Sequence, residues 1–210
     1  MFDAPLRQAL EPALDRVARW LDRPWVTPDR ITLLGLGLGL ASAASAAAAW
    51  WWPALLLWWA SRICDGLDGP LARRRRRRAP ASARQSEAGG FLDITADFVV
   101  YGATVVGVAV GATTSHGQPW WPFLLVLLAY YVNGAAFLAF SSIAERTGRR
   151  LDDGRSLSFL GGLAEGTETI VVHSLWLLLP MWSGTIAWVW ATVVAVSATH
   201  RVVAGYRTLS

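Results

Sequence analysis

The chain has 210 residues, of which 54% are hydrophobic and only 16% are charged. Its apolar residues form long blocks rather than the alternating patterns of soluble helices and strands, which is typical of a protein that crosses a membrane several times. The 13 tryptophans favour the same class, because indole rings prefer the membrane interface. All basic residues are arginine, and the net charge is +4. A single cysteine, Cys64, excludes an internal disulfide and a cysteine-based zinc site.

Residues 1–26 are predicted to form an amphipathic helix that precedes the membrane domain. Apolar side chains recur there at spacings of three or four residues, while arginines and aspartates occupy the other faces. The apolar positions are Leu6, Leu10, Leu14, Val17 and Leu21. We expect this helix to lie in the cytoplasmic interface of the membrane.

Residues 27–210 are predicted to form one membrane domain with six transmembrane helices. Thr27, Pro28 and Asp29 are typical of a helix start, with an N-cap hydroxyl, a proline at the first helical position and an acid that complements the helix dipole. The apolar blocks of spanning length are Ile31–Trp51, Pro53–Leu71, Phe91–Gly111, Trp120–Phe140, Leu157–Leu179 and Thr185–Val203. The expected fold is therefore an all-α polytopic membrane protein with an N-terminal amphipathic interfacial helix.

The connections between these blocks differ in charge on the two sides of the membrane. On one side, the segments Trp50–Pro53, Thr113–Pro122 and Pro180–Gly184 contain no Arg, Asp or Glu. On the other side lie the N-terminal segment, the arginine-rich residues 73–84, the loop 145–155 and the C-terminus. By the positive-inside rule this second side is cytoplasmic. The sequence thus predicts a multi-pass protein of the inner (cytoplasmic) membrane with both termini and the active site facing the cytoplasm.

Four aspartates lie where the second and third predicted spans approach the cytoplasm. Asp65 and Asp68 are three residues apart, and Asp93 and Asp97 are four apart, so each pair shares one face of its helix. Carboxylates within a membrane span are costly unless a cation or water compensates them. Oxygen ligands without His or Cys suit magnesium, manganese or calcium. The pattern therefore predicts a site for two divalent ions.

Other interpretations of these acids stay open at this level. Arginines, Arg62 or Arg73 in particular, could neutralise Asp65 or Asp68 in a structural network. The acids could also serve an ion or proton pathway in a transporter. A pathway would distribute polar residues through the depth of the membrane, whereas these acids gather toward one side, which favours the metal site.

The aspartates belong to a longer motif. The segment Asp65-Gly66-Leu67-Asp68-Gly69-Pro70-Leu71-Ala72-Arg73 is followed, after a spacer, by Gly89-Gly90-Phe91-Leu92-Asp93-Ile94-Thr95-Ala96-Asp97. This arrangement resembles the signature of the CDP-alcohol phosphotransferase (CDP-alcohol phosphatidyltransferase) family, Asp-x-x-Asp-Gly-x-x-Ala-Arg and then Gly-x-x-x-Asp-x-x-x-Asp. The six-helix layout and the Thr27-Pro28-Asp29 segment are also similar to that family. The spacer is longer than usual in the family, which predicts that Arg74–Ala88 forms a longer cytoplasmic excursion.

The resemblance implies a membrane enzyme of phospholipid synthesis that transfers a phosphatidyl-type group from a CDP-activated lipid, such as CDP-diacylglycerol, to a small alcohol acceptor with release of CMP. It implies that Asp65, Asp68, Asp93 and Asp97 bind two Mg²⁺ or Mn²⁺ ions, with Asp97 as general base and Asp93 as its catalytic partner. CDP-lipid contacts are assigned to Asp29, Thr32, Gly66, Gly69, Ala72, Arg73 and Gly89. The resemblance also implies a homodimer. A relative that binds a CDP-lipid without turnover is the alternative.

The acceptor alcohol is expected to lie near the last three helices and the loop that precedes them. The candidate contacts are Arg146, Arg155, Glu165 and Glu168. In family members that use inositol phosphate, the comparable segment resembles Ala-Glu-Arg-x-Glu-Arg, whereas here it is Ala164-Glu165-Gly166-Thr167-Glu168-Thr169. Both basic positions are replaced, which weakens the prediction of a phosphorylated acceptor. Glycerol phosphate, a polyol and an amine all stay open, as does a structural pairing of the glutamates with arginine.

Six consecutive arginines, Arg73–Arg78, follow the second predicted span. Beside a membrane, such a run attracts anionic lipid headgroups at about 1 kcal/mol per residue near the surface. A nucleic-acid partner is not expected, because neither interleaved aromatic residues nor a recognisable binding fold surrounds the run. A solvated signal that keeps this segment in the cytoplasm is the simpler alternative.

Overall fold

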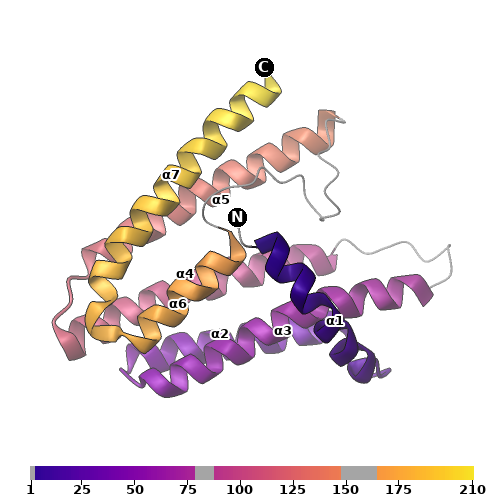
Figure 1. Ribbon diagram of the computed structural model, residues 1–210, viewed down its shortest axis with the longest axis horizontal. Coiled ribbons are helices and arrows are strands. Elements are labelled where there is room, and N and C mark those ends of the chain that lie inside the picture. The colour runs from indigo at the N-terminus through magenta and orange to yellow at the C-terminus, as the bar shows by residue number, and fades with distance from the viewer. Residues whose placement is uncertain (1–2, 79–87, 148–164) are drawn as a thin grey trace.

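The computed structural model describes residues 3–78, 88–147 and 165–210, and every regular element within these ranges is helical (Figure 1). The predicted all-α fold is therefore confirmed for this part of the chain. The elements are α1 (Asp3–Leu21), α2 (Pro28–Ala47), α3 (Trp51–Arg78), α4 (Ala88–His116), α5 (Trp121–Thr147), α6 (Gly166–Leu178), the short 3₁₀ helix η1 (Pro180–Trp182) and α7 (Ser183–Leu209).

Four helices in the described ranges are long and apolar enough to cross a membrane. They are α2, α4, α5 and the continuous segment Pro180–Leu209 that contains α7. Helix α3 has 28 residues, but the acids and arginines in its C-terminal half lower its mean hydropathy. Helix α6 is described over only 13 residues, and residues 157–164 of the predicted fifth span lie outside the described residues. Six crossings thus stay a prediction, whereas the described residues hold four helices that could span a membrane.

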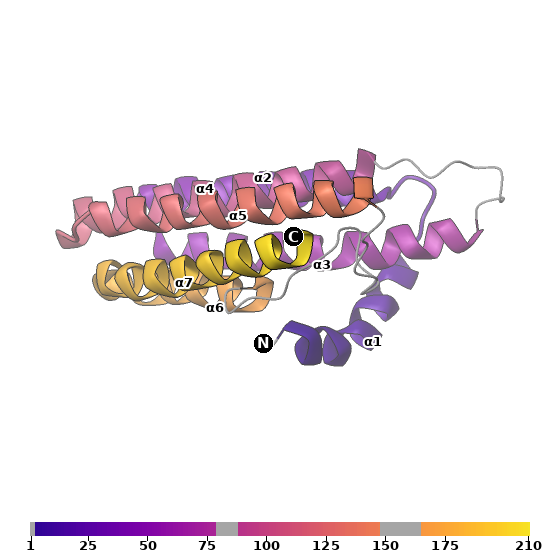
Figure 2. The ribbon, with the colours of Figure 1, turned by 90° about the horizontal axis from the view of Figure 1, so that it is seen from above.

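The long helices form two groups. Helix α2 packs extensively along both α3 and α4, while α5 packs along α7. Figure 1 shows the α5–α7 pair diverging from α2, α3 and α4 toward the C-terminus, and Figure 2 shows that the long helices nevertheless share one general direction. Helices α4 and α5 touch where Gly134 meets the ring of Phe98, because a Cβ on Gly134 would lie 2.4 Å from the ring.

Small residues allow α2 to approach its two neighbours. An added Cβ on Gly107 would lie 2.2 Å from the carbonyl oxygen of Ala43, and one on Gly111 would lie 1.9 Å from that of Ala46. On the other side, a Cβ on Gly35 would lie 3.1 Å from the side chain of Cys64. Such small-residue contacts are how membrane helices gain van der Waals packing. They place the C-terminal half of α4 beside the C-terminal end of α2, and the middle of α3 beside the first half of α2.

The core between the two groups is aromatic. His173 on α6 is fully buried and stacks on Trp58 of α3, with ring centroids 4.9 Å apart. The indole Nε1 of Trp190 donates to the hydroxyl of Tyr130 at 2.6 Å, and that hydroxyl lies 3.0 Å from His173 Nε2. The direction of the hydrogen bond between the hydroxyl and His173 follows from the tautomer of the imidazole. His173 is thus a buried, hydrogen-bonded core residue.

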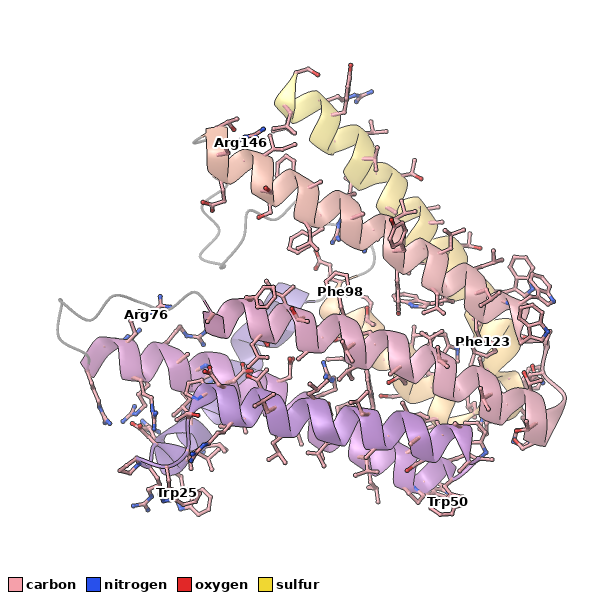
Figure 3. The ribbon with its side chains drawn as sticks, turned by 180° about the vertical axis from the view of Figure 1, so that it is seen from behind. Trp25, Trp50, Arg76, Phe98, Phe123 and Arg146 are labelled. Carbon is pink, nitrogen blue, oxygen red and sulfur yellow. The ribbon has the colours of Figure 1, made fainter. Side chains whose placement is uncertain are left out.

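The surface and ends of the molecule match the chemistry of a bilayer. Large apolar side chains such as Leu34, Leu128 and Val189 are 57%, 58% and 62% exposed, which suits contact with lipid chains. Figure 3 places Trp50 at one end of the helices, and Arg76 and Arg146 toward the other. The uncharged and arginine-rich ends are therefore separated as the sequence predicts, although which end faces the cytoplasm is still inferred from charge alone.

Two local features concern α1 and the end of α3. In α1, Leu14 and Leu21 of the predicted apolar face pack against the rest of the protein together with Ala18, which is 1% exposed, while Val17 is 44% exposed. The interfacial position of this helix stays a prediction. The arginines do not begin a loop: α3 continues as a helix through Arg78. Arginine is a good helix former, and Asp22 accepts ion pairs from arginines of this run, which offsets their mutual repulsion.

Candidate functional site

The start of α2 is built as predicted. The Thr27 hydroxyl accepts a hydrogen bond from the backbone N–H of Arg30 at 3.2 Å, and Pro28 occupies the first helical position. Asp29 follows in the first turn, and its Oδ1 lies 3.3 Å from the point where a Cβ on Gly89 would sit. The cap therefore brings the first turn of α2 against the first turn of α4.

The four aspartates meet between α3 and α4. Asp65 and Asp68 project from α3, and Asp93 and Asp97 project from the facing part of α4. Across the helices, Asp65 lies within hydrogen-bonding reach of Asp97, and Asp93 within reach of Asp68. Helix spacing predicted the two pairs, and the tertiary structure brings all four carboxyl groups into one cluster.

Two side chains contact this cluster, one neutral and one cationic. The Thr32 hydroxyl on α2 donates to Asp68 Oδ2 at 2.6 Å, and both residues are buried. Arg62, one turn before Asp65 on α3, places Nη1 2.7 Å from Asp97 Oδ1 and 3.8 Å from Asp65 Oδ2. Arg62 therefore pairs chiefly with Asp97 of the opposite helix, rather than with the acids of its own helix that spacing alone suggested.

The donor set fits hard divalent cations. If all four carboxyl groups are ionised, Arg62 balances one of four negative charges, which leaves a strong preference for further cations. A small cavity of about 10 Å³ lies among Thr32, Arg62, Asp65 and Asp97, close to the smallest volume that holds one water molecule. Among the described residues, no three His, Cys, Asp or Glu side chains already converge to hold an ion. Loading a metal ion would therefore require these side chains to turn.

The residues assigned to the CDP-lipid fall on two sides of α3. Thr32 contacts the cluster through Asp68, and Asp29 and Gly89 adjoin each other at the first turns of α2 and α4. Gly69 and Ala72 lie on α3 within one turn after Asp68. Arg73 places Nη1 3.4 Å from the point of a Cβ on Gly69, but it also lines the groove described below. Gly66 faces Leu14 of α1 at 3.6 Å and so belongs to the α1–α3 contact.

The acceptor candidates are less tightly grouped. Glu168 Oε2 accepts a hydrogen bond from the backbone N–H of Glu165 at 3.3 Å, so these two glutamates shape the N-terminus of α6. Arg146 is exposed near the C-terminal end of α5. Arg155 lies outside the described residues.

A basic groove of about 210 Å³ runs between α1 and the C-terminal part of α3, lined by Asp15, Pro70, Arg73, Arg74, Arg77 and Arg78. Arg74 follows Asp65 by nine positions, and Arg77 follows Asp68 by nine. Since each residue turns a helix by about 100°, each arginine lies about 180° around the helix from its aspartate. The groove is therefore on the opposite face of α3 from the carboxylates. Asp22 orders one edge of it by pairing with Arg74 at 3.1 Å and with Arg78.

Two features of the site escaped the sequence. The pairing of Arg62 with Asp97 joins residues 35 positions apart, and only the crossing of α3 and α4 reveals it. A partial signal existed, since Arg62 lies three positions before Asp65 and so shares its helix face. The chain of Trp190, Tyr130 and His173 joins three helices and carries no local signal.

Comparison with known proteins identifies the family of the chain. A family model described as CDP-alcohol phosphatidyltransferase matches residues 25–199. The chain is 36% identical over 215 residues to the inner membrane protein YnjF of Escherichia coli (strain K12), covering 100% of this chain and 97% of that protein. It is also 33% identical over 113 residues to the archaetidylinositol phosphate synthase of Methanothermobacter thermautotrophicus, covering 54% of this chain and 51% of that protein.

Solved structures share the fold. The phosphatidylinositol phosphate synthase of Mycobacterium tuberculosis with CDP-DAG bound matches with a TM-score of 0.70 and 20% identity, over 92% of this chain and 93% of the other. The same synthase in complex with manganese and citrate matches with a TM-score of 0.69 and 21% identity, over 92% and 88% of the two chains. Because the family match spans most of the sequence and includes all four aspartates, this chain belongs to the CDP-alcohol phosphatidyltransferase family.

Proposed function

We propose that this protein transfers a phosphatidyl group from CDP-diacylglycerol to a small alcohol and releases CMP. The proposal rests on the cluster of four aspartates between α3 and α4. The cluster consists of Asp65, Asp68, Asp93 and Asp97, and the guanidinium of Arg62 contacts Asp65 and Asp97. So much carboxylate within a membrane protein is costly unless it serves a function. Family membership and the CDP-DAG complex of a protein with the same fold support the same activity.

The four aspartates would hold the divalent ions, Mg²⁺ or Mn²⁺. When bound, the ions would neutralise the diphosphate of the CDP-lipid and the charge that develops on departing CMP. The manganese complex of the structural neighbour supports this choice of ion. Thr32 contributes by fixing one oxygen of Asp68, so that this carboxylate is oriented before a ligand arrives.

The chain's own residues supply the proton transfer and the orientation. The acceptor hydroxyl attacks the phosphorus next to the diacylglycerol and passes its proton to Asp97, with Asp93 as the neighbouring catalytic carboxylate. The bond from that phosphorus to the bridging oxygen of CMP breaks, and CMP leaves with the electron pair. Asp29, Thr32, Gly69, Ala72, Arg73 and Gly89 would contact the CDP-lipid. Gly66 takes no part in this proposal because it faces α1.

The position of the site suits such a substrate. CDP-diacylglycerol has acyl chains that belong in the bilayer and a nucleotide that belongs in water. The carboxylates lie in the arginine-rich half of α3 and the first turns of α4, away from the end that carries Trp50 (Figure 3). A reaction centre near one membrane surface can therefore meet both parts of the lipid.

The test is a CMP-release assay with purified protein in liposomes. CDP-diacylglycerol and Mn²⁺ would be supplied with glycerol 3-phosphate, inositol, inositol phosphate, serine or simple amines in turn. We expect release with one acceptor, loss of release with chelator, and a fall of more than about a hundredfold in Asp93→Asn, since even outer-shell changes at metal sites cost 10–100-fold. Asp22→Asn is the matched control, because it removes a carboxylate outside the cluster and should keep most of the activity.

Two outcomes would redirect the proposal. CDP-lipid binding without CMP release by any acceptor would favour a non-catalytic relative. Metal-independent ion flux in the same liposomes would favour a transporter. The position of Glu165 and Glu168 at the start of α6 makes the acceptor screen essential, because carboxylates suit a polyol or an amine better than a phosphate.

We also propose that the basic groove between α1 and α3 binds anionic lipid headgroups. The groove is lined by four arginines and Asp15, and Asp22 at its edge pairs with Arg74 and Arg78, so positive charge is still in excess. The groove lies on the face of α3 opposite the carboxylates. The membrane helices would carry the protein into any vesicle, so flotation does not test the groove. The measurement instead compares the melting temperature and the activity in nanodiscs of phosphatidylglycerol with those in nanodiscs of phosphatidylcholine. Arg77→Gln should lose the stabilisation by phosphatidylglycerol. Equal melting temperatures in both lipids would contradict the proposal.

A further inference from the structure

Arg62 is the most constrained charged residue of the described chain near the cluster. Its side chain is 4% exposed, whereas the carboxylates of Asp65 and Asp97 are 30% and 33% exposed. The guanidinium carbon lies 5.1 Å from the ring centroid of Trp58 and 5.0 Å from that of Tyr101. Both rings therefore make cation–π contacts with it. Nη2 donates to Ser61 Oγ at 3.0 Å.

Burial of the Arg62 guanidinium costs free energy, and its hydrogen bonds do not offset this cost completely. Arg62 Nε is buried and has no hydrogen-bond partner among the described residues. A buried charge is tolerated only when its counter-charge is well placed, and the counter-charge is Asp97 at 2.7 Å. The ion pair therefore holds Asp97 to the Arg62 side of the cluster.

The same contact conflicts with metal binding. The small cavity beside Asp65 and Asp97 is also lined by Arg62, so an ion that entered it would stand within a few ångströms of a fixed positive charge. At an effective dielectric constant of about 20, a unit charge and a divalent ion at such a distance repel strongly enough to weaken binding by a factor of ten or more. One oxygen of Asp97 is moreover already occupied by the guanidinium.

We infer that Arg62 is the internal counter-ion of the metal-free site: it holds Asp97 in the absence of metal, and divalent ions must compete with this ion pair to load the site. This inference rests on the proposed metal-dependent function. Arg62 is a positioning residue that acts through Asp97. It keeps four facing carboxylates together when no metal is bound, and it makes metal affinity weaker than the four carboxylates alone would provide.

The test compares Mn²⁺ binding by the wild-type protein and Arg62→Gln in detergent without substrate, with free Mn²⁺ followed by electron paramagnetic resonance. We expect the Kd for Mn²⁺ to fall at least about tenfold in Arg62→Gln. Loss of structure alone would weaken Mn²⁺ binding, so tighter binding by Arg62→Gln is a result that misfolding does not produce.

Two further variants separate charge from packing. Arg62→Lys keeps a positive charge, so its Kd should stay closer to that of the wild type than that of Arg62→Gln does. Arg201→Gln removes another buried guanidinium, which lies 5.9 Å from the ring of Phe137 in the α5–α7 pair, and its Kd for Mn²⁺ should not change. Equal or weaker Mn²⁺ binding by Arg62→Gln overturns the inference alone. No binding by either protein overturns the proposed metal site.

A second measurement does not depend on the folding of an Arg62 variant. In metal-free protein, Asp97→Asn removes the closest partner of the buried guanidinium, whereas Asp93→Asn only relieves repulsion among the carboxylates. The melting temperature of Asp97→Asn should therefore fall below that of Asp93→Asn. If Asp97→Asn is the more stable of the two, Arg62 is not the counter-ion of Asp97.

Discussion

Replacing Thr32 with valine tests whether the hydrogen bond from α2 to Asp68 matters for catalysis. The hydroxyl donates to Asp68 Oδ2 at 2.6 Å, and both residues are 7% exposed, so water does not replace the bond easily. Valine keeps the shape of the side chain and removes only the donor. Asp68 would then keep its charge but lose the contact that fixes one of its oxygens.

The expected loss follows from this contact. A hydrogen bond to a charged group contributes about 1.5–3 kcal/mol, and each 1.4 kcal/mol is a factor of ten, so kcat/KM should fall by about tenfold to 150-fold. The concentration of Mn²⁺ that gives half-maximal activity should rise as well, because a less ordered carboxylate binds a metal ion less tightly. The melting temperature should also fall, because a buried oxygen of Asp68 loses its hydroxyl partner.

Both quantities come from the CMP-release assay with an Mn²⁺ titration. Thr104→Val is the matched control: Thr104 is also buried, but its hydroxyl donates within α4 to the carbonyl of Val100 at 2.8 Å, which also accepts in the helix. This control should retain nearly all activity. If Thr32→Val is as active as Thr104→Val, the reasoning that Thr32 orients Asp68 is wrong.

Two further predictions concern the packing that holds the site together. Gly111→Ala should lower the melting temperature by several degrees or prevent folding, because the new Cβ would lie 1.9 Å from a carbonyl oxygen of α2. Gly102→Ala, where a Cβ would meet nothing within 4 Å, should be neutral or slightly stabilising. Thermal unfolding in detergent compares the two variants. Tyr130→Phe leaves a buried indole N–H and a buried imidazole nitrogen without their partner, so the free energy of unfolding should fall by about 1–3 kcal/mol. Tyr206→Phe removes a hydroxyl from a side chain that is 76% exposed, and the same measurement should show almost no change.

Local patterns predicted the features that depend on neighbours along the chain. The Thr27 cap, the long apolar helices and the shared faces of the two aspartate pairs all follow from spacings of one to four residues, which helix geometry converts directly into direction. The same logic leaves one choice open. Val17 and Ala18 both fit an apolar stripe, and only the angle at which α1 lies on α3 decides which of them is buried.

The arginine run shows how a distant residue can decide a local structure. The long spacer in the motif predicted a cytoplasmic excursion from Arg74 onward, and like charges repel along a helix. Asp22, more than fifty residues earlier, accepts ion pairs from Arg74, Arg75 and Arg78 and favours the helical form. No local pattern contains this information.

The sequence by itself determined that the protein is helical, belongs in a membrane and carries two acidic helix faces, since each of these depends on composition or on residues within one turn of each other. Only the tertiary structure decided that Arg62 holds Asp97 and that Thr32 holds Asp68, which are 35 and 36 positions apart. The physical reason is that such pairs depend on how closely α2 packs against α3 and α4. That distance is governed by Gly35, Gly107 and Gly111, whose missing side chains allow the backbones to meet.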